Sequence, residues 1–200
     1  MRTILQILVS PRTQSISRRV ALEVTDRILA RHLGARVTVR DLARDPPPHP
    51  SSELYETILT GAAHDDPRLE LSERLIAELE AADCVVIGTP MNNFTVPSTL
   101  KAWIDHVVRI RRSFRSSPQG KVGLLHDRPV VVVTAHGGYC GDLPLMQPDF
   151  LTPYLRTIFS TIGIHDLRFL RLEGLTRGAE GVATALDGAR SWMDKNLPEQ

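Results

Sequence analysis

Residues 85–94 read V-V-I-G-T-P-M-N-N-F, and this stretch decides the fold. An apolar, β-branched run stops at Gly88, a small polar and aromatic loop follows, and a new helix is expected from about Pro97. Helical patterns on both sides of such a run indicate a buried strand of a parallel sheet. Open α/β sheets bind ligands in the loops just beyond the carboxyl ends of their strands. We therefore expect a binding site at Met91, Asn92, Asn93 and Phe94.

Strand and helix patterns alternate along the rest of the chain. Apolar or alternating runs predict further strands over residues 2–9, 36–41, 129–134 and 166–172. Between them and after the last, helical spacing predicts six helices, among them 53–63, one opening at Asp66 and Pro67, 97–108 and 150–162. This order predicts one α/β domain over residues 1–200, with a doubly wound, five-stranded parallel sheet in the order 2-1-3-4-5.

Composition narrows the classes of partner. The 200 residues are 42% hydrophobic and 24% charged, with a formal net charge of +1, so no bulk attraction to nucleic acid or to an anionic membrane is expected. No apolar run approaches the roughly 20 residues of a membrane span, and the N-terminus lacks a signal-peptide pattern. We expect a cytoplasmic protein with a small-molecule or protein partner.

Several conspicuous residues have a structural interpretation. Cys84 and Cys140 are too few and too isolated for a disulfide framework or a zinc site, and Cys84 reads as a small core residue. Trp103 lies on the apolar face of its helix. The basic stretch 109–115, R-I-R-R-S-F-R, is either a solvated face on an excursion from the fold or an attraction for a phosphorylated substrate.

Two other strand-end loops have ligand-binding chemistry. Residues 10–17, S-P-R-T-Q-S-I-S, place hydroxyls where a helix must begin, and free N–H groups with the helix dipole favour an anion there. Capping alone also explains these hydroxyls. Residues 135–141, A-H-G-G-Y-C-G, contain paired glycines that let the backbone approach a ligand. A phosphate linked to a flat heteroaromatic ring, as in flavin mononucleotide (FMN), would use all three loops.

The combined motifs make the chain resemble the FMN-dependent NADH azoreductase and quinone reductase family of flavodoxin-like proteins. The family's P-M-x-N-F loop appears at 90–94, its S-x-S loop at 15–17, and its R-G-G loop as His136-Gly137-Gly138. V-R-D-L at 39–42 and T-P-Y-L at 152–155 are also similar. The chain departs from the family at Asn92, often aromatic, and at His136, often Arg, and these departures concern substrate preference.

The resemblance implies a three-layer fold and a ping-pong reaction. NADH or NADPH would deliver a hydride to the N5 atom of FMN, and a quinone or azo compound would then take two electrons. It also implies a homodimer whose interface completes the substrate pocket. The implied FMN contacts are Ser10, Ser15, Ile16, Ser17, Met91, Asn92, Asn93, Phe94, Ala135, His136, Gly137 and Gly138, with His136 a candidate for hydrogen bonding or proton supply.

Other functions remain open at this point. A flavodoxin-type electron carrier would share the fold, but such carriers are usually strongly acidic and this chain is nearly neutral. An FMN reductase that supplies reduced flavin is a second alternative. A phosphate-binding receiver domain would need clustered acids at strand ends, and the end of the first strand is Ser10-Pro11.

Overall fold

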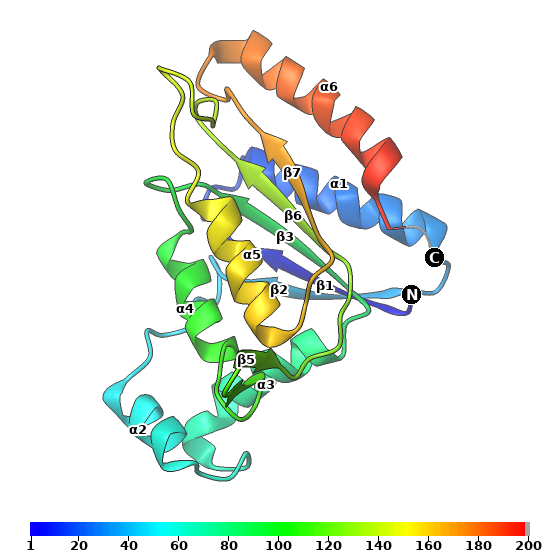
Figure 1. Ribbon diagram of the computed structural model, residues 1–200. Helices are drawn as coiled ribbons and strands as arrows, with labels where there is room; N and C mark the ends of the chain where they lie inside the picture. The colour runs from blue at the N-terminus through cyan, green and yellow to red at the C-terminus, as the bar shows by residue number, and fades with distance from the viewer. Residues whose placement is uncertain (199–200) are drawn as a thin grey trace.

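Five parallel strands form the centre of the molecule (Figure 1), which we describe from a computed structural model over residues 1–198. They pair in the order β2-β1-β3-β6-β7. Their bounds are β1 Thr3–Leu8, β2 Arg36–Asp41, β3 Cys84–Pro90, β6 Val130–Ala135 and β7 Leu167–Leu172. The predicted parallel sheet of five strands is confirmed. The numbering differs from the predicted 2-1-3-4-5 because a separate hairpin of β4 (Phe114–Ser117) and β5 (Gly120–Gly123) precedes β6 in the chain.

Helices cover both faces of the sheet, as Figure 1 shows. On one face lie α1 (Ile16–Arg31) and α6 (Gly178–Asn196), which pack in one hydrophobic cluster with the sheet. On the other lie α3 (Glu70–Glu80), α4 (Ser98–Val107) and α5 (Leu151–Ile162), in a second cluster. The short helices α2 (Ser52–Thr60) and η1 (Pro67–Leu69) lie at the periphery. The three predicted layers are present, and no helix within residues 1–198 has both the length and the apolar character needed to cross a bilayer.

Strand β3 runs further than its sequence pattern indicated. Thr89 and Pro90 still pair with Thr134 and Ala135 of β6, so the strand does not end at Gly88. Gly88 instead lies under α1, where an added Cβ would come within 2.7 Å of the Ala21 Cβ and 2.9 Å of the Ser17 carbonyl oxygen. The glycine therefore lets the first turns of α1 pack closely against the sheet, and this contact positions the loop before α1.

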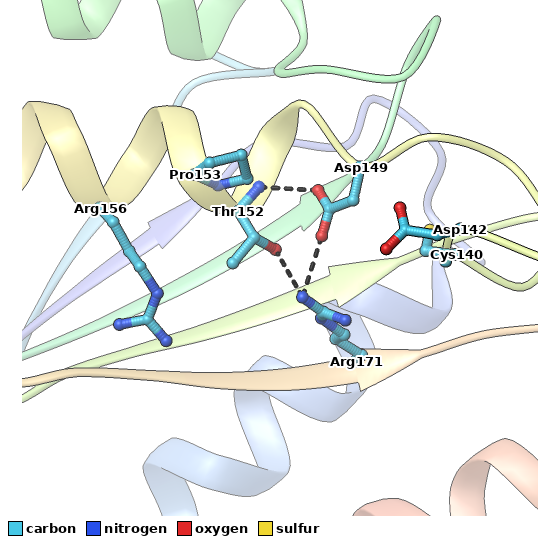
Figure 2. Close-up of a pocket in the computed structure, with 8 residues that line it drawn as sticks. Cys140, Asp142, Asp149, Thr152, Pro153, Arg156 and Arg171 are labelled. Atoms are coloured by element: carbon cyan, nitrogen blue, oxygen red, sulfur yellow. Dashed lines mark hydrogen bonds and ion pairs between the residues drawn. The ribbon is translucent and has the colours of Figure 1, made fainter.

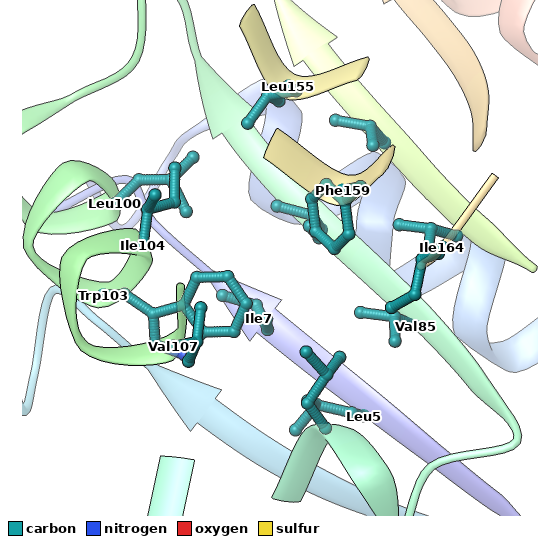
Figure 3. Packing of buried hydrophobic residues seen from close by; sticks show 14 of the residues in the cluster. Leu5, Ile7, Val85, Leu100, Trp103, Ile104, Val107, Leu155, Phe159 and Ile164 are labelled. Carbon is teal, nitrogen blue, oxygen red and sulfur yellow. The ribbon is translucent and has the colours of Figure 1, made fainter. Parts of the chain in front are cut away.

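The core between α4, α5 and the sheet contains large apolar side chains (Figure 3). Trp103 on α4 and Phe159 on α5 are almost completely buried there. The interpretation of Trp103 as a packing residue is thus confirmed. Cys84 is also a core residue, and its burial raises the pKa of the thiol to about 12. A side chain that stays protonated at neutral pH is unsuited to nucleophilic chemistry.

The sequence pattern missed the hairpin formed by β4 (Phe114–Ser117) and β5 (Gly120–Gly123). Its strands are only four residues long and mostly polar, so they lack the alternation that marks a longer strand. Gly123 allows the hairpin to contact α5 because an added Cβ would collide with the backbone of Gly163. Gly163 itself ends α5 in the left-handed conformation, with a φ of 99°.

The basic stretch before this hairpin is mostly neutralised. Arg109 is 3% exposed and pairs with Glu73 of α3, while Arg112 bonds Glu73 at 2.8 Å and Glu80 at 2.6 Å. Arg111 donates to the Ile58 carbonyl at the end of α2. Arg109 and Arg112 therefore form neither a solvated face nor an attraction for a phosphorylated substrate. Both pair with carboxylates of α3 and so attach this segment to that helix.

Glu73→Gln is expected to lower the free energy of unfolding at neutral pH by about 2–4 kcal/mol, because it leaves the buried Arg109 without its counter-ion. Burial alone would raise the Glu73 pKa, but hydrogen bonds from Arg112 and Arg109 outweigh it and lower that pKa. The stabilisation is therefore present above the unfolded pKa of about 4.3 and is lost as the pH falls through the lower folded value. Urea unfolding over a pH series measures this, and the gap between wild type and variant should close in acid. The exposed Glu56→Gln serves as control, and a pH-independent gap would contradict the pairing.

Candidate functional site

Loops from the carboxyl edge of the sheet surround a cavity of about 570 Å³. This volume is within the usual range of small-molecule sites, about 300–1,000 Å³. Residues from the ends of β1, β3, β6 and β7 and from α6 line it: Ser10, Pro11, Arg12, Gln14, Ser15, Ile16, Pro90, Met91, Asn92, Ala135, His136, Gly137, Leu175, Thr176 and Val182. The three loops expected to meet do so.

The loop after β1 is held in place from both ends. Ser15 caps α1 by accepting the Arg18 N–H, and its hydroxyl lies 2.9 Å from that of the fully buried Ser17. The Arg18 guanidinium donates to the Ser10 carbonyl at 3.1 Å and to Asp41 of β2 at 2.8 Å. That pairing with Arg18 lowers the pKa of Asp41, so the carboxylate stays charged. The loop is therefore fixed before any ligand arrives.

The electrostatics of this cavity favour an anion. Among residues 1–198, no carboxylate side chain lines it, and Arg12 is the only arginine or lysine in its wall. The first N–H groups of a helix have no acceptor inside the helix, and at Ile16 these groups border the cavity. A phosphate at this end would gain hydrogen bonds and the favourable end of the helix dipole.

The loop after β3 makes a tight turn with unusual backbone angles. Asn93 and Phe94 both have positive φ, at 48° and 68°, and Asn92 and Thr95 exchange backbone hydrogen bonds across them. Two successive left-handed residues are typical of a type I′ turn, which Asn tolerates well and Phe does not. Strain of this kind, of order 1–3 kcal/mol, concentrates at functional sites. Phe94 is 45% exposed, whereas Met91 and Asn92 of the same loop line the cavity.

The loop after β6 is fastened to the connection between β7 and α6. Thr176 donates to the Gly137 carbonyl through its N–H at 3.1 Å and its hydroxyl at 2.8 Å, and Gly174 donates to Gly138 at 3.2 Å. The carbonyls of Gly137 and Gly138 thus accept hydrogen bonds, whereas the N–H groups of the same two residues have no acceptor among residues 1–198. These amides are available for a polar ring edge.

The surroundings of the His136 side chain do not favour the predicted role in proton supply. Its side chain is completely buried, with Nε2 at 2.7 Å from the Thr134 hydroxyl and Nδ1 at 3.1 Å from the Cys140 sulfur. Burial lowers the pKa of the ring, which therefore stays neutral at neutral pH. With both nitrogens occupied, the ring cannot bond a ligand without breaking a contact, so the predicted role in proton supply gains no support here.

Most of the predicted contacts border the cavity. Its wall includes eight of the twelve, namely Ser10, Ser15, Ile16, Met91, Asn92, Ala135, His136 and Gly137. Ser17, Asn93, Phe94 and Gly138 lie in the same loops but do not line it. The missed residues are Pro11, Arg12, Gln14, Pro90, Leu175, Thr176 and Val182. The rule that ligands bind at strand ends applies equally to β7, and following it there would have found Leu175 and Thr176.

Comparison with known proteins agrees with this geometry. The family model described as flavodoxin-like fold matches residues 2–197. An FMN-dependent NADH:quinone oxidoreductase of Pseudomonas fluorescens Pf-5 is 46% identical over 96% of this chain and 93% of its own length. A second protein of that name, from Cupriavidus pinatubonensis, is 47% identical over 96% of both chains.

Solved structures agree as well. An FMN-dependent NADH-azoreductase of Bacillus anthracis str. Ames Ancestor, solved in complex with FMN, superposes with a TM-score of 0.78 at 25% identity, covering 99% of this chain and 100% of that one. An azoreductase of Bacillus anthracis str. Sterne has the same fold, with a TM-score of 0.85 over 98% of this chain and all of its own, at 21% identity. The family-model match and the two relatives show that the chain belongs to the flavodoxin-like family and, within it, to the FMN-dependent NADH:quinone oxidoreductases.

Proposed function

We propose that this protein binds FMN and uses NADH to reduce quinones and azo compounds by two electrons. The observation that supports it most directly is one cavity that joins the hydroxyl-lined start of α1 to the loop after β3 and to the loop after β6, where the Gly137 and Gly138 amides have no acceptor among residues 1–198. Relatives 46% and 47% identical are named for this quinone reduction, and a structural neighbour is named for azo reduction. We further propose that residues 1–200 form one FMN-binding domain. We also propose a cytoplasmic location, in agreement with the expectation from the sequence.

The residues present fit FMN along its whole length. Ser10, Ser15 and the first N–H groups of α1 would hold the phosphate, with Ser17 behind Ser15. Met91 to Phe94 would lie against the ring system, and the amides of Gly137 and Gly138 would meet its polar edge. When bound, FMN supplies the redox chemistry between a dihydronicotinamide and a quinone or azo compound.

The chain itself contributes position and electrostatics. Its loops are tied to one another, through Arg18 with Asp41 and through Thr176 with Gly137, so the cavity needs little ordering on binding. The lack of carboxylates along the wall avoids repulsion of the phosphate. The neutral, buried His136 adds no charge beside the ring.

An enzyme fits better than the two alternatives. A docking electron carrier would need a strongly charged face, and the formal net charge here is only +1. An FMN reductase would release its reduced flavin, whereas the fixed loops favour retention of FMN. The names of the relatives support NADH as the donor.

The visible spectrum of the purified protein tests the assignment. We expect flavin absorption that bleaches when NADH is added without oxygen and returns when a quinone is added. Free FMN at the same concentration is the control, because it reacts with NADH far more slowly in solution. A colourless protein that takes up no FMN would refute the proposal.

Ser15→Ala is expected to weaken FMN affinity by about 0.5–1.5 kcal/mol, the usual value of one hydrogen bond. The change also removes a helix cap and should lower the free energy of unfolding by about 1 kcal/mol. Ser51→Ala is the matched control, because Ser51 caps α2 in the same way, by accepting the Leu54 N–H at 3.2 Å, and does not line the cavity.

Titration of the apoprotein with FMN, followed by flavin fluorescence, measures the affinity. Ser17→Ala should give a smaller loss than Ser15→Ala, because the Ser17 hydroxyl acts on the ligand only through Ser15. Equal FMN affinity in the Ser15 and Ser51 variants would remove Ser15 from the phosphate site.

The proposal includes a homodimer. The segment between β6 and α5 exposes three large apolar side chains, Leu143, Leu145 and Phe150, with exposed fractions of 66%, 105% and 60%. The Phe150 N–H donates to the Phe94 carbonyl at 3.1 Å, which joins the end of this segment to the turn at Asn93 and Phe94. Exposed apolar side chains close to a ligand-site loop in the chain favour coverage by a partner, and a second copy of the chain is the occupant we propose.

The double variant Leu143→Asp, Leu145→Asp should convert the dimer to a monomer, because two carboxylates would have to be buried at the interface. Light scattering after gel filtration measures the mass. Leu33→Asp is the control, since Leu33 is 96% exposed just after α1, outside the segment between β6 and α5. A wild-type protein with the mass of one chain would refute the dimer.

A further inference from the structure

Arg12 is the only arginine or lysine that lines the FMN cavity within residues 1–198. In that part of the chain its guanidinium has no carboxylate oxygen within 4 Å, and its side chain makes no hydrogen bond. Many other arginines also lack a carboxylate partner, so this alone does not distinguish Arg12. Its position does, because among these arginines it alone lies in the wall of the cavity.

The backbone of Arg12 is bonded to the two serines that would hold the phosphate. The Arg12 N–H donates to the Ser10 hydroxyl at 3.3 Å, and the Arg12 carbonyl accepts the Ser15 N–H at 3.1 Å. Both serines therefore fix the point from which the Arg12 side chain extends. Because the Ser10 oxygen already accepts this bond, the proton of its hydroxyl remains available to donate to a ligand.

The start of α5 shows how this fold neutralises an anion at the beginning of a helix (Figure 2). There Asp149 accepts the N–H groups of Leu151 and Thr152 at 3.0 and 2.8 Å. Arg171 of β7 pairs with the other carboxylate oxygen of Asp149 at 3.0 Å. Burial alone would raise the pKa of Asp149, but hydrogen bonds from Thr152 and the charge of Arg171 outweigh it and lower that pKa. The chain thus supplies its own anion to α5, with an arginine beside it.

The start of α1 has comparable donors but no carboxylate. The N–H groups of Ile16 and Ser17 have no acceptor among residues 1–198, and no carboxylate side chain of these residues lines the cavity. Arg12 corresponds to Arg171 at α5, since it is the arginine close to these N–H groups in the chain. An anion from outside the chain would therefore complete the start of α1 as Asp149 completes the start of α5.

We propose that Arg12 pairs with the phosphate of FMN and makes the cavity select FMN over riboflavin, the same flavin without its phosphate. The inference rests on the proposed function and adds the residue that supplies charge at the phosphate end. The serine hydroxyls and the helix N–H groups are neutral donors, whereas a guanidinium fork adds charge-assisted bonds to two phosphate oxygens. Because Arg12 is exposed, solvent limits this contribution and salt screens it.

Titration of FMN and of riboflavin into the full-length apoprotein tests the proposal by binding alone. Arg12→Gln should weaken FMN binding by about fivefold, the upper end for an exposed ion pair, and leave riboflavin binding unchanged. Arg12→Lys keeps the charge without the fork and should lose less FMN affinity. Arg19→Gln is the matched control, because Arg19 is an exposed arginine on α1 that lies outside the cavity wall and has no carboxylate oxygen within 4 Å among residues 1–198.

Salt concentration gives a second readout that a purely structural role of Arg12 would not change. Added KCl should weaken FMN binding more in wild type than in Arg12→Gln, and it should change riboflavin binding little in both. Equal losses of FMN and riboflavin affinity in Arg12→Gln would overturn the proposal, because they would show a disturbed loop. Equal FMN affinity in wild type and Arg12→Gln would overturn the pairing and leave the proposed function intact. A wild-type protein that bound neither flavin would refute both together.

Discussion

The close approach of α1 to β3 at Gly88 is the contact on which the binding site depends. With any larger residue there, the Cβ would meet Ala21 and the Ser17 backbone, and the start of α1 would have to move off the sheet. The loop from Ser10 to Ser15 would move with it, away from the loops after β3 and β6. A parallel sheet brings these loops to one edge, but this packing contact sets the distance between them.

The sheet could be predicted because buried parallel strands are nearly pure apolar runs, as β3 and β6 are. The cavity loops could be predicted because their serines, paired glycines and P-M-x-N-F motif can be identified within short stretches of sequence. The hairpin β4–β5 could not, since its contact with α5 depends on two glycines forty residues apart. The orientation of His136 was also beyond prediction, because only the fold brings Thr134 and Cys140 to its two nitrogens.

Charge is distributed unevenly over the molecule. Arg109 and Arg112, which precede β4, pair with Glu73 and Glu80, although a basic run in a sequence suggests an anion site. Arg12 is an isolated basic residue in the sequence, yet it lines the cavity and has no carboxylate oxygen within 4 Å among residues 1–198. Pairing in three dimensions, and not the density of basic residues, therefore decides which cations remain available to a ligand.

The turn at Asn93 and Phe94 restricts how this protein can diversify. A β-branched side chain at either position would have to adopt a backbone region that its Cβ nearly forbids, so the accessible replacements there are few. Asn92, whose own φ is not positive, lies in the cavity wall without that restriction. We therefore expect new acceptor preferences to arise by substitution at Asn92. Substitutions at Asn93 and Phe94 should be rarer, because the turn requires a positive φ at both.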